Sequence, residues 1–93
     1  VYHTAESGDF PLVLGGDHSI ALGSLAGMGR FAKEKHKRLG VLYVDAHGDF
    51  NTDETSPSGN IHGECLAASC GYGLKELTDL YYEGVKIQAS ANL

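Results

Sequence analysis

Three potential metal ligands recur at every second position in one short segment of this sequence. Asp45, His47 and Asp49 alternate with Ala46 and Gly48. An extended backbone directs every second side chain to the same face, so the three ligands can converge on one point. Without a cation between them, the carboxylates would repel one another and lose hydration, so the segment predicts a metal site. The alternative is a loop whose acids face water. Gly48 is expected to let the backbone turn tightly enough to aim these side chains.

A fourth potential ligand, His18, follows two glycines and an aspartate in Gly15-Gly16-Asp17-His18. Alone it could be a helix N-terminal residue with a satisfied hydrogen bond, but the acidic triplet favours a ligand role. Carboxylate oxygen and imidazole nitrogen without thiolate suit Mn²⁺, with Fe²⁺, Co²⁺ and Zn²⁺ as alternatives. Two histidines on different segments, with a carboxylate able to bridge, indicate two ions.

Two apolar runs precede these ligands and must position them. Residues 11–14 and 41–44 each form a short apolar stretch, and both predict buried strands of a parallel sheet. Because ligands bind at the carboxyl ends of parallel strands, His18 and the segment 45–49 should be neighbours in space.

A helix is expected between the two strands, which gives a βαβ unit at about 11–45. Asp17 or Ser19 can cap its start. The basic stretch through Arg38 and then Gly40 should end it. Four residues at helical spacing predict its buried stripe: Ala21, Leu25, Met28 and Ala32.

A polar loop over residues 50–60 follows, and it should line the ligand side of the sheet. A helix is expected from 61 to about 70 and a short one over 74–82. His62 is either a proton carrier at the rim of the cleft or a helix-capping residue. Polar loop residues that could grip a zwitterionic ligand, or serve only in turns, are Asn51, Ser56, Ser58 and Asn60.

Composition narrows the class of protein. The 93 residues are 42% hydrophobic and carry a net charge of −5, with five of the seven basic residues between positions 30 and 38. This balance argues against a nucleic-acid groove and suits cation binding, and the basic cluster fits a solvated helix end. No apolar run is long enough to span a membrane. Cys65 and Cys70 fit buried free thiols, which suggests a reducing, cytoplasmic compartment. We interpret residues 1–93 as a single partial domain from a larger protein.

Three motifs together resemble a known family. They are Gly15-Gly16-Asp17-His18-Ser19, Asp45-Ala46-His47-Gly48-Asp49-Phe50-Asn51 and Ser58-Gly59-Asn60-Ile61-His62-Gly63. They are similar to the metal-dependent ureohydrolases, specifically arginases. The first two motifs are shared with agmatinases, whereas Asn51 and the third motif point to arginase. The resemblance implies an α/β fold, a three-layer α/β/α arrangement on a largely parallel sheet, of which 93 residues hold only part.

The resemblance also implies a role for each ligand. His18 would bind one Mn²⁺ and His47 the other, and Asp45 would bridge them. Asp49 would bind the first ion and orient a metal-bridging hydroxide. That hydroxide would attack the guanidinium carbon of L-arginine to give L-ornithine and urea.

Further roles follow for the polar loop. Asn51, Ser58 and Asn60 would hold the α-carboxylate of arginine, and His62 would shuttle protons. The parent would take a small-molecule substrate, contact neither nucleic acid nor membrane, and form a homo-oligomer, a trimer or hexamer.

Three other functions stay open at this point. One is an agmatinase or another ureohydrolase, another is a catalytically dead regulatory homologue, and the third is a structural α/β domain with incidental acids. Arginases also carry a later Asp-x-Asp that supplies further ligands to both ions, and it does not occur in these 93 residues. We therefore expect this piece alone to be inactive and only marginally folded.

Overall fold

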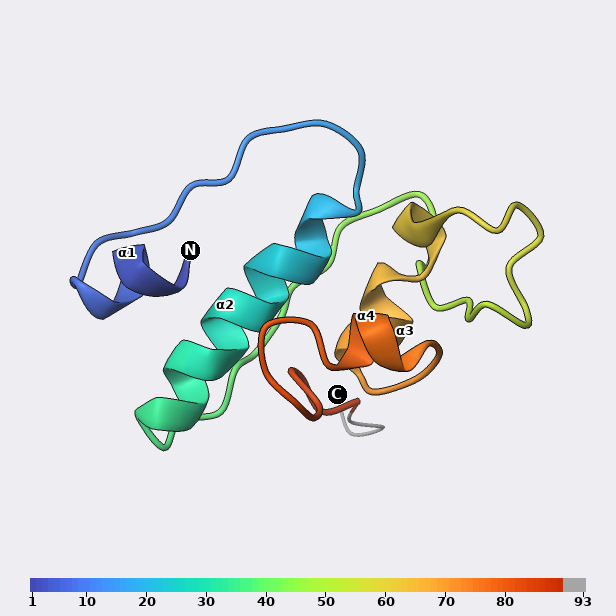
Figure 1. Ribbon diagram of the computed structural model, residues 1–93. Coiled ribbons are helices and arrows are strands. Elements are labelled where there is room, and N and C mark those ends of the chain that lie inside the picture. The colour runs from blue at the N-terminus through green and yellow to red at the C-terminus, as the bar shows by residue number, and fades with distance from the viewer. Residues whose placement is uncertain (90–93) are drawn as a thin grey trace.

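The computed structural model describes residues 1–89 and contains five helical elements (Figure 1). They are α1 (Tyr2–Glu6), α2 (Ile20–Glu34), the 3₁₀ helix η1 (Ile61–Gly63), α3 (Cys65–Ser69) and α4 (Lys75–Thr78). Helix α2 is the longest, and it contacts α1 as well as α3. Helix α3 also contacts η1 and α4, so α2 and α3 together connect all the other elements.

The expected central helix is present, but its bounds and its buried face differ from the prediction. It ends at Glu34 rather than near Arg38, because His36 adopts a left-handed backbone with φ 53°. Of the predicted stripe, Ala32 alone is buried, and the buried face is offset by about one position. The helix turns this face because it packs between α1, which the sequence pattern did not predict, and α3. The buried residues are Leu22, Ala26, Gly27, Gly29 and Ala32.

A small core joins α2 to α3. Leu22 of α2 packs against Cys65 and Ala68 of α3, with Ala21 and Leu77 partly buried beside them. The prediction of a helix from 61 to about 70 is confirmed in outline, since η1 and α3 occupy that range. The last predicted helix is also present but covers only Lys75–Thr78.

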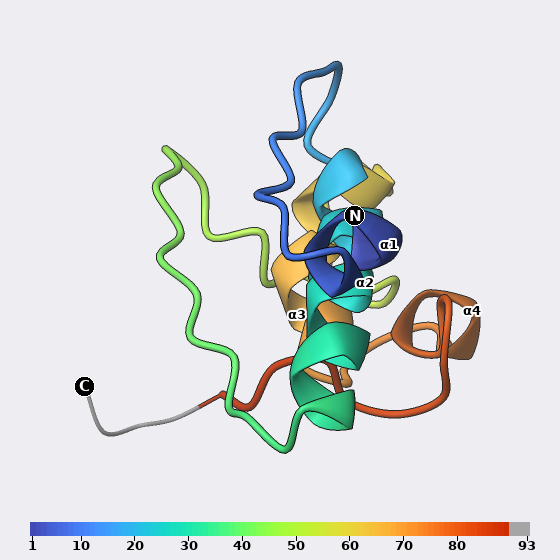
Figure 2. The same ribbon diagram turned by 90° about the vertical axis from the view of Figure 1, so that its left-hand side faces the viewer.

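The two predicted strands are absent from the residues that the structure describes, so the βαβ unit expected at about 11–45 is not confirmed. Both segments are extended but form no strand pairing, and Figure 2 shows them as separate segments. Their apolar side chains are exposed rather than buried, 83% for Leu14 and 92% for Leu42. A strand forms only when neighbouring backbone satisfies its N–H and C=O groups, and within the described residues these segments do not supply that to each other.

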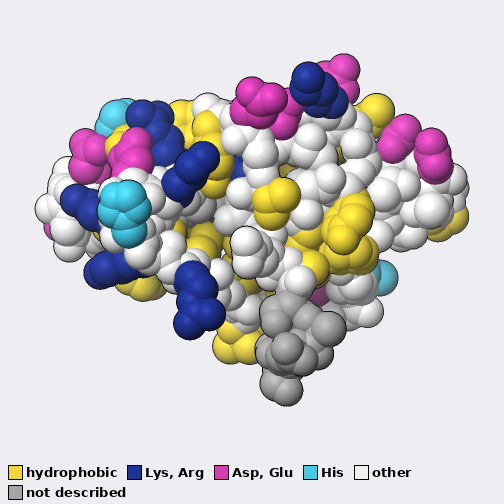
Figure 3. All heavy atoms as spheres, turned by 90° about the horizontal axis from the view of Figure 1, so that it is seen from below, with side chains coloured by type: hydrophobic (Ala, Val, Ile, Leu, Met, Phe, Trp, Pro, Cys, Tyr) yellow, Lys and Arg dark blue, Asp and Glu magenta, His cyan; other side chains and the backbone are white. Residues whose placement is uncertain are grey.

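The basic cluster lies where the sequence placed it. Lys33, Lys35, Lys37 and Arg38 are all exposed at the end of α2. Figure 3 shows basic side chains gathered over one half of the face seen from below. The prediction of a solvated helix end is confirmed. No helix in the described range is long and apolar enough to cross a bilayer.

Two glycines of α2 differ sharply in their surroundings, which gives a matched test of the packing. A Cβ on Gly29 would lie 2.5 Å from the Tyr82 hydroxyl and 3.1 Å from the Lys86 carbonyl oxygen, whereas a Cβ on Gly23 meets no atom of the described residues within 4 Å.

We predict that Gly23→Ala stabilises the full-length protein by about 0.5–1 kcal/mol, because alanine favours a helix interior. Gly29→Ala should destabilise it by about 1–3 kcal/mol, the usual cost of overpacking. Thermal unfolding followed by circular dichroism measures both. Equal changes in the melting temperature of the two variants would contradict the close packing of residues 82–86 on α2.

Candidate metal and substrate site

Three of the four predicted metal ligands meet in one cluster. The Nδ1 atom of His18 lies 2.6 Å from Oδ2 of Asp45 and 2.8 Å from Oδ2 of Asp49. One donor atom from each residue lies within 4.8 Å of the others. His18 precedes α2 and the two acids follow the extended segment 41–44, so the predicted convergence is confirmed although no sheet supports it. The donor set of one imidazole and two carboxylates fits a divalent cation of the Mn²⁺ type.

His47 lies beside this cluster rather than in it. Its Nδ1 atom is 3.5 Å from Oδ1 of Asp45, and its side chain is 85% exposed. Asp45 therefore presents one carboxylate oxygen to His18 and the other to His47. The backbone N–H of His47 also donates to Oδ1 of Asp45 at 2.9 Å, and this hydrogen bond is the main reason that the pKa of Asp45 is lowered. The carboxylate is thus held ionised between two imidazoles.

The tight turn that aims these ligands is at Asp49, not at Gly48 as we expected. Asp49 has φ 49°, a left-handed conformation that aspartate adopts more readily than most residues, whereas Gly48 is not left-handed. The carbonyl oxygen of Asp49 accepts the N–H groups of Leu66 and Ala67 at 3.0 and 3.1 Å. Because those groups belong to the first turn of α3, the start of that helix fixes the backbone of a candidate metal ligand.

Tyr43 also belongs to this cluster, although the sequence pattern did not identify it. Its hydroxyl donates to Oδ2 of Asp49 at 2.8 Å and lies 3.3 Å from Nδ1 of His18. Its ring stacks on the His18 ring, with centroids 5.0 Å apart. Burial, followed by the hydrogen bond to Asp49, raises the pKa of Tyr43, so the hydroxyl remains a donor. The signal was present in the sequence, since position 43 continues the alternation of 45, 47 and 49.

Cys65 connects α3 to the backbone of His18. Its thiol contacts the carbonyl oxygens of His18 at 3.4 Å and of Ile61 at 3.3 Å. The residue is fully buried, and burial is the main cause that raises its pKa to about 11. Both cysteines are free, as predicted, with Cys65 buried and Cys70 half-buried.

A cavity of about 270 Å³ opens next to the metal residues. It brings together most of the predicted catalytic and substrate-binding positions, although Asn60, His18 and Asp45 do not line it. The lining residues are His47, Gly48, Asp49, Asn51, Ser56, Pro57, Ser58, His62 and Gly63.

The polar loop closes on itself around this cavity. The N–H of Asn51 donates to the carbonyl oxygen of Gly63 at 3.2 Å, which ties the two ends of the loop together. Asn60 stabilises the turn at residues 58–60, since its N–H donates to Oγ of Ser58 at 3.2 Å. His62, which belongs to η1, has Nδ1 3.8 Å from a carboxylate oxygen of Asp17.

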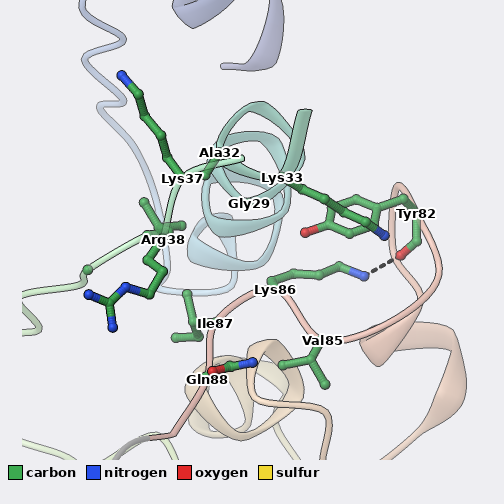
Figure 4. A pocket seen from close by; sticks show the side chains of 12 residues that line it. Gly29, Ala32, Lys33, Lys37, Arg38, Tyr82, Val85, Lys86, Ile87 and Gln88 are labelled. Carbon is green, nitrogen blue, oxygen red and sulfur yellow. Dashed lines mark hydrogen bonds between the residues drawn. The ribbon is translucent and has the colours of Figure 1, made fainter. Parts of the chain in front are cut away.

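A larger hollow of about 640 Å³ lies elsewhere, between the second half of α2 and residues 82–88 (Figure 4). Its most buried cation, Lys86, donates to the carbonyl oxygens of Thr78 at 2.7 Å, Gly84 at 2.8 Å and also Tyr82. Lys86 is therefore already satisfied by the backbone. None of the predicted site residues lines this hollow.

Comparisons with known proteins agree with the geometry. Residues 1–91 match the model of the Arginase family. Over 80 residues the chain is 59% identical to an arginase of Bacillus caldovelox. This alignment covers 86% of this chain and 25% of that protein. It is 58% identical over 83 residues to an arginase of Brevibacillus brevis, and this alignment covers 89% of this chain and 26% of that protein. This chain thus spans about a quarter of the length of these curated relatives.

Solved structures give the same result for the backbone. A crystal structure of arginase from Bacillus cereus matches 92% of this chain and 28% of its own, with a TM-score of 0.86 and 60% identity. A crystal structure of arginase from Bacillus subtilis matches 94% of this chain and 29% of its own, with a TM-score of 0.84 and 55% identity. The described backbone is therefore arranged as part of an α/β arginase fold, although its extended segments are unpaired here.

The cluster predicts opposite effects of one substitution with and without a cation. Asp49→Asn retains a residue that tolerates the left-handed backbone but removes one of two neighbouring negative charges. In the metal-free full-length protein at pH 8, we expect the variant to melt at or above the temperature of the unaltered protein.

With Mn²⁺ at a hundred times its Kd, the unaltered protein should gain about 2.7 kcal/mol of stability for each ion that it binds. The variant should gain at least about 1.4 kcal/mol less, which corresponds to tenfold weaker binding. Melting curves in EDTA and in MnCl₂ measure both quantities, with the exposed loop variant Asp53→Asn as control. Equal Mn²⁺ stabilisation of Asp49→Asn and Asp53→Asn would contradict the role of Asp49 as a ligand.

Proposed function

Because this chain belongs to the arginase family, we propose that the whole protein hydrolyses L-arginine to L-ornithine and urea with two Mn²⁺ ions. One observation carries the proposal. The cluster of His18, Asp45 and Asp49 adjoins a cavity that is lined by His47 and His62. Residues 1–93 would then form part of a single catalytic domain.

The contacts around Asp45 support two ions rather than one. Asp45 directs Oδ2 toward His18 and Oδ1 toward His47. His18 and Asp49 would hold the first ion, His47 would hold the second, and Asp45 would bridge them. When bound, paired ions lower the pKa of a water molecule and so supply hydroxide near neutral pH.

Residues of the cavity would position the substrate and move a proton. Asn51, Ser58 and Asn60 would bind the α-carboxylate of arginine and its waters. Asp49 would orient the nucleophile toward the guanidinium carbon. Addition of hydroxide to that carbon would give a tetrahedral intermediate, which would collapse by breaking the bond from the carbon to the side-chain nitrogen, and His62 would give the departing amine its proton.

The whole protein has further expected properties. The free thiols of Cys65 and Cys70 support a reducing compartment, and we expect a cytoplasmic location. We also expect a homo-oligomer, a trimer or hexamer, whose partner in catalysis is a small molecule.

Comparison of arginine with agmatine tests the substrate. Agmatine lacks the α-carboxylate, so polar groups that bind this carboxylate would be left without a partner. We expect the full-length protein to favour arginine in kcat/KM by at least roughly a hundredfold, since sites built around a polar group reject analogues that lack it.

Asn51→Ala provides the matched variant for this comparison. It should raise KM for arginine and leave the hydrolysis of agmatine nearly unchanged. Urea release measures both reactions. A preference for agmatine would establish another ureohydrolase, and no urea from either substrate would support a catalytically dead homologue.

A second prediction concerns His62, which lines the cavity but is not part of the ligand cluster. His62→Ala should lower kcat by roughly ten- to a hundredfold, because water or buffer replaces a proton carrier only in part. Added imidazole should restore part of the rate, and elemental analysis should find the metal content unchanged. Loss of metal in this variant would instead identify His62 as a ligand.

A further inference from the structure

We propose that Tyr43 is a positioning residue of the metal site, which holds the carboxylate of Asp49 with its hydroxyl and the imidazole of His18 with its ring. The inference rests on the proposed function only in requiring that these two residues bind a divalent cation. It adds a residue outside the ligand set, and it assigns a function to a side chain that the sequence pattern placed in a buried strand.

The hydroxyl contacts both ligands at one point. It donates to Oδ2 of Asp49 at 2.8 Å, and the same oxygen lies 2.8 Å from Nδ1 of His18. The hydroxyl itself is 3.3 Å from that nitrogen. A phenol that donates to one lone pair of Oδ2 leaves Oδ1 and a second lone pair available to a cation. Tyr43 can therefore fix the carboxylate without occupying all of its coordination sites.

The ring contributes a second constraint. It lies nearly parallel to the His18 ring, with an interplanar angle of 24° and centroids 5.0 Å apart. A stacked neighbour limits rotation of the imidazole about its χ2 torsion, which otherwise varies broadly. Outer groups that orient metal ligands in this way commonly affect metal affinity by ten- to a hundredfold.

The position of Tyr43 in the chain explains why this residue reaches the site. It stands two residues before Asp45 on an extended segment, so both side chains lie on the same face. Its neighbours Leu42 and Val44 are 92% and 88% exposed, whereas Tyr43 is half-buried. Within this apolar segment, Tyr43 is the residue that packs against the ligands.

Asp49 is then held from two directions. The start of α3 fixes its backbone through the carbonyl oxygen, and Tyr43 fixes its carboxylate. A ligand that is ordered before the ion arrives loses less conformational freedom on binding. Loss of the hydroxyl should therefore weaken binding of the ion, while the fold remains intact.

The test is Tyr43→Phe in the full-length protein, with Mn²⁺ affinity measured by calorimetric titration of the metal-free form. We expect Mn²⁺ to bind roughly ten- to a hundredfold more weakly. The melting temperature in EDTA should change by no more than about 2 °C, because the ring stays in place and the carboxylate of Asp49 keeps its contact with His18. Tyr43→Leu, which also removes the stacked ring, should weaken binding further.

The control is Tyr72→Phe. Tyr72 is 53% exposed, its ring lies 5.7 Å from that of Phe50, and its hydroxyl makes no hydrogen bond to the described residues. This variant removes the same atom and should bind Mn²⁺ as the unaltered protein does.

The outcomes separate the two proposals. If the unaltered protein binds Mn²⁺ and releases urea from arginine but Tyr43→Phe binds Mn²⁺ equally well, the role of Tyr43 is overturned and the proposed function stands. A large drop in the EDTA melting temperature of Tyr43→Phe would also overturn that role, because it would make the residue structural. If the unaltered protein binds no Mn²⁺, the proposed function fails, and the role of Tyr43 fails with it.

Discussion

The site depends on one backbone interaction, the acceptance of two N–H groups of α3 by the carbonyl oxygen of Asp49. The first turn of a helix offers N–H groups that have no partner within the helix. Asp49 supplies that partner only by adopting a left-handed conformation, with φ 49°. This conformation turns the chain so that the Asp49 carboxylate faces His18. A candidate metal ligand and a helix start therefore stabilise each other, and the short helix Cys65–Ser69 has a role beyond packing.

Much of the site could be predicted because its pattern is local. Alternation along an extended segment placed Asp45, His47 and Asp49 on one face, and the structure brings two of them to His18. The errors arose where the outcome depended on contacts distant in sequence. We assigned the turn to Gly48 because glycine commonly permits it, but the bonds to α3 impose it on Asp49. Tyr43 was missed because an apolar neighbourhood suggested a buried strand, and its polar partners lie beyond that segment.

The fold was less predictable than the site for a related reason. Helical spacing identified α2, but which face is buried depends on α1 and α3, whose positions no local pattern specifies. The segments 11–14 and 41–44, which contain Leu14 and Leu42, have the apolar composition of buried strands. Strand formation, however, requires hydrogen bonds from other chain segments. Within the described residues those bonds are absent, and the apolar side chains remain exposed. The chain nevertheless superposes on a solved arginase over 92% of its length, so the overall path of the backbone agrees with that fold although no strand pairing is present.

Convergence of the ligands without a paired sheet shows which contacts carry the geometry. In a parallel sheet, adjacent strand ends would bring His18 and Asp49 together. Here α3 has that role, since its first residue, Cys65, contacts the carbonyl oxygen of His18 while its first turn holds that of Asp49. Tyr43 then joins the two side chains directly. Helix α3 and Tyr43 act on backbone and side chains respectively, so the ligand arrangement is defined by short-range contacts. Sheet pairing would reinforce this arrangement rather than create it.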